Sequence, residues 1–138
     1  MPEQKDRVIV REVQESDNNF IMATWLKGLY FGNSWFREIP QDIYFRNYHA
    51  VIEKIVSRPK VRIKVACLEL MPDAVLGYCV YEGPIIHWIF VKSSYREVGI
   101  AKMIVPDGIT QCSHITHIGR SLKRKKDIIF NPFFEESL

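Results

Sequence analysis

Residues 85–106 read IIHWIFVKSSYREVGIAKMIVP, and this stretch decides the fold that the sequence predicts. Its first part, residues 85–91, is almost entirely apolar, which is typical of a central strand covered on both faces. After a short polar loop, Ile100, Met103 and Ile104 recur at helical spacing. The stretch therefore predicts a buried strand that leads through a tight loop into a helix.

The loop itself predicts a phosphate-binding turn. Arg96 and Gly99 stand three residues apart, and the small residue Ala101 lies at the start of the helix. Backbone N–H groups in such a turn point into one concavity at the positive end of the helix dipole. Gly99 would let a ligand approach the backbone closely. The alternative is an ordinary connection between a strand and a helix.

Upstream of this stretch, the sequence predicts a strand and two helices. Alternation over residues 7–13 predicts the strand. Ser16 and Asp17 then cap a first helix that breaks at residues 32–34, and Asp42 caps a second helix that ends at residues 58–59.

The middle of the chain predicts two further strands before the buried one. Residues 61–67 and 75–81 form these strands, with turns at residues 71–73 and 82–84. Short turns join antiparallel neighbours, so the sequence predicts a mixed, mostly antiparallel sheet flanked by helices.

Length and composition bound the protein to one ordinary domain over residues 1–138. The chain is 47% hydrophobic and 25% charged, which excludes disordered and collagen-like classes. No apolar run approaches the roughly 18 residues of a membrane span, and the start of the chain has no secretory signal. Three cysteines without a close pair disfavour zinc fingers and disulfide scaffolds, so we expect a cytoplasmic protein.

The net charge of +3 hides a local excess of basic residues. Five basic residues and no acidic one lie within residues 120–126. Such a cluster on an otherwise neutral chain suggests a phosphate-bearing ligand or, with weaker support, a nucleic acid. The support for a nucleic acid is weak because the cluster contains no aromatic residue and no recognisable groove-reading helix. The alternative is a solvated helix face or loop.

The sequence resembles the GNAT family of acetyl-coenzyme A-dependent N-acyltransferases. The family signature Q/R-x-x-G-x-G/A follows its fourth strand, and residues 96–101, REVGIA, match every specified position. The order of the other predicted elements also agrees, so the resemblance covers residues 7–105. It implies an α/β (α+β) GNAT-like fold that takes acetyl-CoA as co-substrate and uses no metal.

In this family the backbone of the fourth strand binds the pantetheine arm and the signature amides bind the pyrophosphate. The resemblance implies that acetyl-CoA lies between the fourth and fifth strands. The implied binding residues here are Phe90, Val91, Lys92, Arg96, Glu97, Val98, Gly99, Ile100, Ala101 and Lys102.

The C-terminal part departs from the family pattern. Pro106 interrupts the signature helix after about two turns, and few residues follow it. Residues 113–119 predict a fifth strand and residues 128–130 a short last one. We therefore expect a shortened C-terminal part, or one completed by a second chain in a homodimer.

His87 is the first candidate for the general base. It lies on the apolar strand nine residues before Arg96, where some amine acetyltransferases of the family carry a histidine. Glu82 is a second candidate, and Tyr95 or Tyr81 could protonate the leaving thiolate. The alternatives are a hydrogen-bonded core histidine, a solvated turn carboxylate and packing tyrosines.

Other polar and aromatic residues give weaker signals. His114 and His117 lack a third ligand at metal-binding spacing, and Cys112 lacks an activating partner. Aromatic residues gather between residues 30 and 36, where Trp35 and Phe36 could line an apolar acceptor site, form core or make a dimer contact.

Two functions follow from these observations. The first is an N-acetyltransferase in which a primary amine attacks acetyl-CoA directly. The second is a non-catalytic GNAT-like module that binds a protein or nucleic acid, supported by the short C-terminal part and the basic cluster. The compact chain also loosely resembles acetyltransferase-like proteins of bacteriophages.

Overall fold

A six-stranded mixed sheet forms the centre of the computed structural model, which describes residues 6–96, 98–114 and 128–134. The strands follow one another in the sheet in chain order. Neighbours from β1 to β4 are antiparallel, whereas β4 with β5 and β5 with β6 are parallel. The strands are β1 (Val8–Glu12), β2 (Arg62–Leu68), β3 (Met71–Glu82), β4 (Ile85–Val91), β5 (Gln111–Cys112) and β6 (Ile129–Phe130). The predicted fold class is confirmed.

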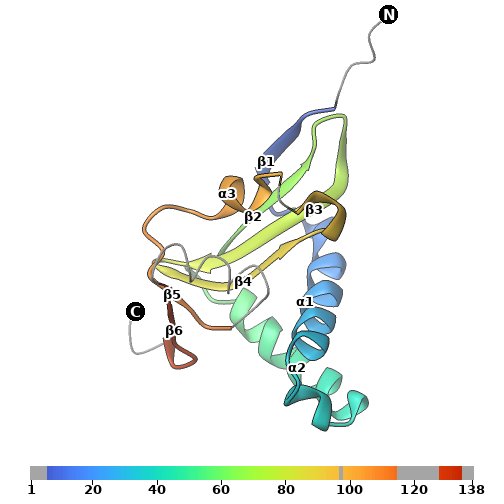
Figure 1. Cartoon of the computed structure of the whole chain (residues 1–138), viewed down its shortest axis with the longest axis vertical. Helices are drawn as coiled ribbons and strands as arrows, with labels where there is room; N and C mark the ends of the chain where they lie inside the picture. The colour runs from blue at the N-terminus through green and yellow to red at the C-terminus, as the bar shows by residue number, and fades with distance from the viewer. Residues whose placement is uncertain (1–5, 97, 115–127, 135–138) are drawn as a thin grey trace, which may run out of the picture.

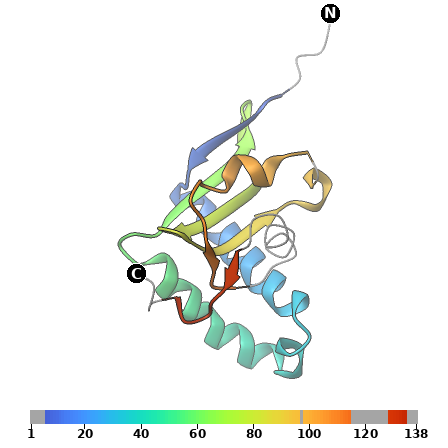
Figure 2. The same cartoon turned by 60° about the vertical axis from the view of Figure 1, so that its left-hand side comes forward.

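Helices lie on both faces of this sheet. Two long helices, α1 (Asn18–Gly32) and α2 (Gln41–Val56), lie together on one face, and the short α3 (Ile100–Ile104) lies on the other (Figures 1 and 2). Single 3-10 turns precede these helices as η1 (Glu15–Asp17), η2 (Phe36–Glu38) and η3 (Ser93–Tyr95). None of the helices in the described ranges is both long and apolar enough to cross a membrane.

The larger part of the core fills the space between α1, α2 and the sheet. Trp25 of α1 is fully buried and stacks on Trp88 of β4, with ring centroids 5.7 Å apart. Tyr44 of α2 is buried as well, and its hydroxyl donates to the Leu26 carbonyl at 2.9 Å. A hydrogen bond from α2 to α1 therefore fixes the two helices against each other.

The smaller part of the core lies under α3. Ile100 and Ile104 point from α3 into a buried cluster with Leu76, Ile89 and Val91 of the sheet. This burial explains why five residues suffice to hold α3, since so short a helix is marginal on its own. α3 ends at Ile104, two positions before Pro106, so the predicted interruption of this helix is confirmed.

Gly77 of β3 permits the close approach of α3 and β4. A Cβ atom there would lie 2.7 Å from the Phe90 carbonyl oxygen and 3.3 Å from Cγ2 of Ile100. Gly77→Ala should therefore lower the free energy of unfolding by about 1–3 kcal/mol, measured by urea denaturation. Gly32→Ala is the control, because a Cβ there meets nothing within 4 Å, and alanine at this helical position should leave the free energy of unfolding unchanged or raise it by up to about 1 kcal/mol. Equal losses in the two variants would contradict this explanation.

The predicted helix caps are wrong in detail. Asp17 stands at the N-cap of α1, but its carboxylate makes no capping hydrogen bond to that helix. It accepts two hydrogen bonds from Arg11, at 2.8 and 3.0 Å, and one from the Gln14 amide. Asp42 lies in the first turn of α2, whose N-cap is Pro40. Asp17 is used by a tertiary ion pair instead of a helix cap, and α2 begins two residues earlier than a cap at Asp42 requires.

The predicted turn at residues 71–73 is also wrong. β3 begins at Met71, which pairs with Leu68, and the turn comes at residues 69–70. Two register shifts near this end of the β2–β3 pair accommodate Pro72, which has no N–H to give. Its carbonyl accepts a hydrogen bond from Arg11 at 2.8 Å instead.

The fifth strand begins earlier than predicted. β5 is Gln111–Cys112, and Ser113 extends the pairing by donating its amide to the Ile86 carbonyl at 2.9 Å. Residues 115–119 of the predicted strand, and the basic residues 120–126, lie outside the described residues. The short last strand predicted at residues 128–130 is confirmed as β6.

Candidate functional site

The loop between β4 and α3 has the backbone of a tight, open turn. Gly99 precedes α3 with φ of 87° and ψ of 10°, a left-handed conformation that favours glycine. A Cβ atom at Gly99 would meet nothing within 4 Å, so the space in front of this backbone is free. Here the conformation, rather than packing, requires the glycine.

The other residues of the loop divide into those that hold it and those that face outward. The Arg96 side chain turns back, and its Nε donates to the Val91 carbonyl at 3.1 Å. The Lys92 amide donates to the Leu76 carbonyl at 2.7 Å, so it serves the sheet. Val98 is exposed, with 64% of its surface accessible, and Ile100 is buried. Glu97 lies outside the described residues.

Beside this loop, β4 is longer than its parallel neighbour. Within the described ranges, β5 pairs with β4 only at Ile85 and Ile86. From Trp88 to Val91, β4 therefore has a described strand only on its β3 side. This end of β4 leads directly to the Gly99 turn.

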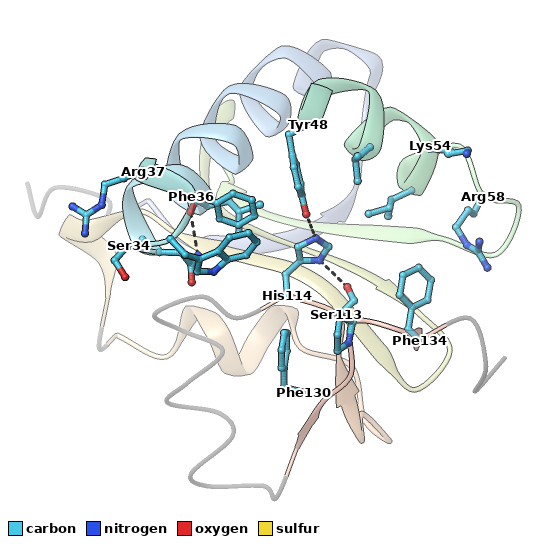
Figure 3. Close-up of a pocket in the computed structure, with 17 residues that line it drawn as sticks. Ser34, Phe36, Arg37, Tyr48, Lys54, Arg58, Ser113, His114, Phe130 and Phe134 are labelled. Atoms are coloured by element: carbon cyan, nitrogen blue, oxygen red, sulfur yellow. Dashed lines mark hydrogen bonds between the residues drawn. The ribbon is translucent and has the colours of Figure 1, made fainter. Parts of the chain in front are cut away.

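A cavity of about 890 Å³ lies between α2 and the end of β5 (Figure 3). The segment between α1 and α2, one side of α2, the end of β5 and the C-terminal part after β6 line it. Its aromatic and polar lining includes Trp35, Phe36, Arg37, Tyr48, Lys54, Arg58, Ser113, His114, Phe130 and Phe134. None of the described lining residues is acidic. An apolar molecule with a neutral or anionic polar group would fit such walls.

A chain of hydrogen-bonded side chains runs from this cavity into the protein; we call it the Tyr48–Glu82 chain. Figure 3 shows its cavity end, where the Tyr48 hydroxyl points from α2 at His114. Tyr48 Oη lies 2.6 Å from His114 Nε2, and His114 Nδ1 lies 2.9 Å from Ser113 Oγ. Ser113 Oγ lies 2.8 Å from His87 Nδ1, and His87 Nε2 lies 2.9 Å from Glu82 Oε1. Every polar side-chain atom of both histidine rings therefore has a partner.

Local backbone geometry places His87 at the centre of this chain. Val80 pairs with Trp88, whereas the next residue of β3, Tyr81, pairs with Ile86, so β4 has one extra residue there. This extra residue is His87, and the irregularity is a β-bulge. The imidazole is fully buried, and the ring of Phe134 lies edge-on to it at 4.5 Å.

The inner end of the chain is an ion pair. Arg58 Nε lies 2.9 and 3.0 Å from the two carboxylate oxygens of Glu82. Burial raises the pKa of Glu82, but hydrogen bonds from Arg58 and His87 outweigh it, so this pKa is lower than usual. Glu82 is therefore a carboxylate at neutral pH.

Both histidines of the chain are neutral at neutral pH. Burial lowers the pKa of His87, against the opposing effect of Glu82. Burial and the nearby His87 lower the pKa of His114 to about 4. Burial also raises the pKa of Tyr48 to about 12, which keeps its proton on the oxygen.

The structure brings together two of the three predicted catalytic residues. His87 and Glu82 are in direct contact, and Glu82 is buried rather than solvated at a turn. Tyr95 is separate from them, because η3 places it, partly buried, against the core cluster that also holds α3. Tyr81 packs partly buried in that cluster too.

Sequence reasoning missed Tyr48, Ser113 and His114 as members of this site. The sequence placed Tyr48 in the predicted second helix without any signal of a site, and His114 gave only half of an incomplete metal pair. His117 lies outside the described residues, and Cys112 is buried. In the described ranges, no three His, Cys, Asp or Glu side chains gather as metal ligands would.

The aromatic residues before α2 serve two purposes. Tyr30 and Phe36 are buried in the core, as the packing interpretation expected. Trp35 is 62% exposed and stacks on Phe36 at 3.8 Å, and both line the cavity. The interpretation as an acceptor wall therefore stays open for these two residues.

Comparison with solved structures identifies the fold. No protein-family model and no curated protein matches this sequence. Among solved structures, the glucosamine N-acetyltransferase region of a fungal multi-domain β-N-acetylglucosaminidase, described as GCN5-related, has a TM-score of 0.50 and 15% identity. That match covers 74% of this chain and 12% of that one. The GCN5-related N-acetyltransferase fold is therefore the fold of this chain.

Two other solved structures give similar figures. YjaB from Escherichia coli has a TM-score of 0.47 and 14% identity over 71% of this chain. This chain spans 61% of the length of that protein. An aminoglycoside N-acetyltransferase in complex with CoA has a TM-score of 0.46 and 14% identity, over 99% of this chain and 86% of that one. The bacteriophage resemblance and the cytoplasmic location stay predictions.

Proposed function

We propose that this chain is a GNAT-family N-acetyltransferase, which transfers an acetyl group from acetyl-CoA to a primary amine. One observation carries the proposal: within the signature motif, Gly99 has a left-handed backbone with open space in front of it, directly between β4 and α3 of a GCN5-related fold. A motif this short occurs by chance, but its place in this fold is specific.

The end of β4 and the Gly99 turn together fit a bound acetyl-CoA. Acetyl-CoA would supply an activated thioester carbonyl for attack by the amine. The β4 backbone toward Val91 would hold the extended pantetheine arm, and the amides around Gly99 would hold the pyrophosphate. Arg96 would act through its side-chain contact with the Val91 carbonyl, which holds the turn against β4. Lys102, in the last turn of α3, would add positive charge for the phosphates.

The cavity under α2 would hold the acceptor amine. Trp35, Phe36 and Phe130 give it aromatic walls, which favour an apolar body. The described lining offers no carboxylate to hold an ammonium group, and it includes Arg37 and Lys54. The cavity therefore favours an apolar amine in its neutral form over a polycation.

His87 would be the base, paired with Glu82. A neutral imidazole can take up the proton that the amine loses as its nitrogen bonds to the acetyl carbon. The carboxylate of Glu82, 2.9 Å away, would stabilise the imidazolium that results. His87 does not face the cavity itself, so the proton needs intermediate groups.

Binding of acetyl-CoA tests the proposed function directly. At 100 times its dissociation constant, acetyl-CoA should stabilise the wild-type protein by about 2.7 kcal/mol, visible as a thermal shift. Gly99→Glu should abolish the shift, because it places a carboxylate where the pyrophosphate would bind.

Gly108→Glu is the matched control for this variant. Gly108 also has a positive φ, of 81°, with nothing within 4 Å of its Cβ position, but it lies outside the motif. Its variant should suffer similar backbone strain and keep the acetyl-CoA shift. A folded wild type without any shift would refute the proposal and favour the non-catalytic binding module instead.

A further inference from the structure

The Tyr48–Glu82 chain has more members than a base and its carboxylate require. Tyr48, His114 and Ser113 come from α2 and from the end of β5, and the proposed function gives them no part so far. All three line the cavity, whereas His87 is fully buried behind them. They therefore connect the acceptor cavity with the buried pair.

The donors and acceptors along this chain can be assigned from its inner end. A carboxylate only accepts hydrogen bonds, so a neutral His87 must carry its proton on Nε2, facing Glu82. Nδ1 of His87 is then an acceptor, and the Ser113 hydroxyl donates to it.

The same reasoning fixes the outer half of the chain. Ser113 has one proton, which it gives to His87, so its oxygen must accept from His114. His114 thus carries its proton on Nδ1, and its Nε2 accepts from the Tyr48 hydroxyl. All four hydrogen bonds run in one direction, and the two histidines have opposite tautomers.

We propose that Tyr48, His114 and Ser113 relay protons between the acceptor cavity and the His87–Glu82 pair. This inference rests on the proposed acetyl transfer. The amine gives a proton to the Tyr48 oxygen as Tyr48 gives its own to His114 Nε2. His114 then passes its Nδ1 proton to Ser113, and Ser113 passes its proton to His87 Nδ1.

The protons of the whole reaction balance along this route. After the transfer His87 is an imidazolium beside the Glu82 carboxylate, and each relay group has lost one proton and gained one. When the carbon–sulfur bond breaks, the same route in reverse returns one proton to the leaving thiolate. The relay then regains its resting arrangement.

The surroundings hold the relay rings in place. The ring of Tyr44 stacks on Tyr48 at 5.4 Å, and the ring of Trp25 meets His114 edge-on at 5.9 Å. Phe134 covers His87. Because these side chains are buried and already hydrogen-bonded to one another, they keep their mutual alignment.

The tautomers of the two histidines test the relay without an acceptor. In ¹⁵N-histidine-labelled protein at pH 7, NMR should show His87 protonated on Nε2 and His114 protonated on Nδ1. Single His→Gln variants assign the signals. If His87 carries its proton on Nδ1, or both nitrogens of His87 are protonated, the relay is overturned, whatever the acetyl-CoA thermal shift shows.

A matched pair of tyrosine variants tests the role of the relay in turnover. With acetyl-CoA and 2-phenylethylamine as substrates, Tyr48→Phe should lower kcat about 100-fold and leave the KM for acetyl-CoA unchanged. Tyr44→Phe removes a neighbouring hydroxyl that serves only the Leu26 carbonyl, and it should keep kcat within about threefold. Equal values of kcat in the two variants would overturn the proposal. Failure of acetyl-CoA to bind would instead refute the acetyl transfer itself, with the tautomers unchanged.

Discussion

Glu82→Ala should lower the free energy of unfolding by about 3 kcal/mol. The substitution leaves the buried Nε2–H of His87 without an acceptor and removes one carboxylate partner of Arg58. Arg58 is partly exposed, which keeps the loss below that of a fully buried ion pair. Glu82→Gln should cost less, because one side-chain oxygen can still accept from both neighbours.

Chemical denaturation of three variants checks this expectation. Glu69→Ala is the control, since Glu69 also accepts two hydrogen bonds from an arginine, Arg7, at 2.8 and 3.0 Å. That pair is exposed, so its loss should lower the free energy of unfolding far less than Glu82→Ala does. If Glu69→Ala and Glu82→Ala cost the same, the buried environment of Glu82 contributes nothing.

The sequence predicted the sheet well because its signals are local. The apolar run at residues 85–91 is β4 to the residue, and the loop that follows leads into α3 as expected. These predictions depend on strand periodicity, a glycine and a helical repeat, and all three patterns are defined by residues close together in the sequence. The same locality explains the wrong cap at Asp17, whose carboxylate is used by Arg11 of a different element.

The site was predictable only in part, because its partners are far apart in sequence. His87 and Glu82 are five residues apart across one turn, and both were predicted. Ser113 reaches His87 from 26 residues away through the β4–β5 pairing, and Tyr48 reaches His114 from 66 residues away through α2. No sequence period reports such contacts.

The bulge in β4 is a further feature that sequence patterns do not reveal. The pattern of residues 85–91, in which every residue but His87 is apolar, does not say where the pairing with β3 shifts by one residue. The bulge nevertheless decides the chemistry, since it occurs at the histidine that contacts both Glu82 and Ser113.

Acidification should destabilise the protein before its carboxylates titrate. In the unfolded chain His114 has a pKa of about 6.5, whereas in the folded protein burial and the nearby His87 lower this pKa to about 4. Between these values the unfolded state binds a proton that the folded state does not, so stability falls as the pH falls. Burial lowers the pKa of His87 as well, which adds in the same direction.

The expected loss from His114 alone is about 2 kcal/mol between pH 6.5 and pH 4.5. The groups that face its ring are Tyr48 from α2, Trp25 from α1 and, through Ser113, His87 from β4. Glu82, whose folded pKa is lowered, loses its own stabilisation only below its unfolded value near 4.5, so this window belongs to the histidines.

Urea denaturation at several pH values, with two histidine variants, measures this contribution. His114→Gln should make the free energy of unfolding depend less steeply on pH, because the variant lacks the proton that the unfolded chain binds at His114. His49→Gln is the control, because His49 is exposed on α2 beside Glu53 and lies away from the buried ring of His114. Parallel curves for the two variants would show that His114 is not held neutral in the fold. Below about pH 6.5 the proton route from Tyr48 to His87 would then lose its acceptor at His114 Nε2, because a protonated ring has none to offer.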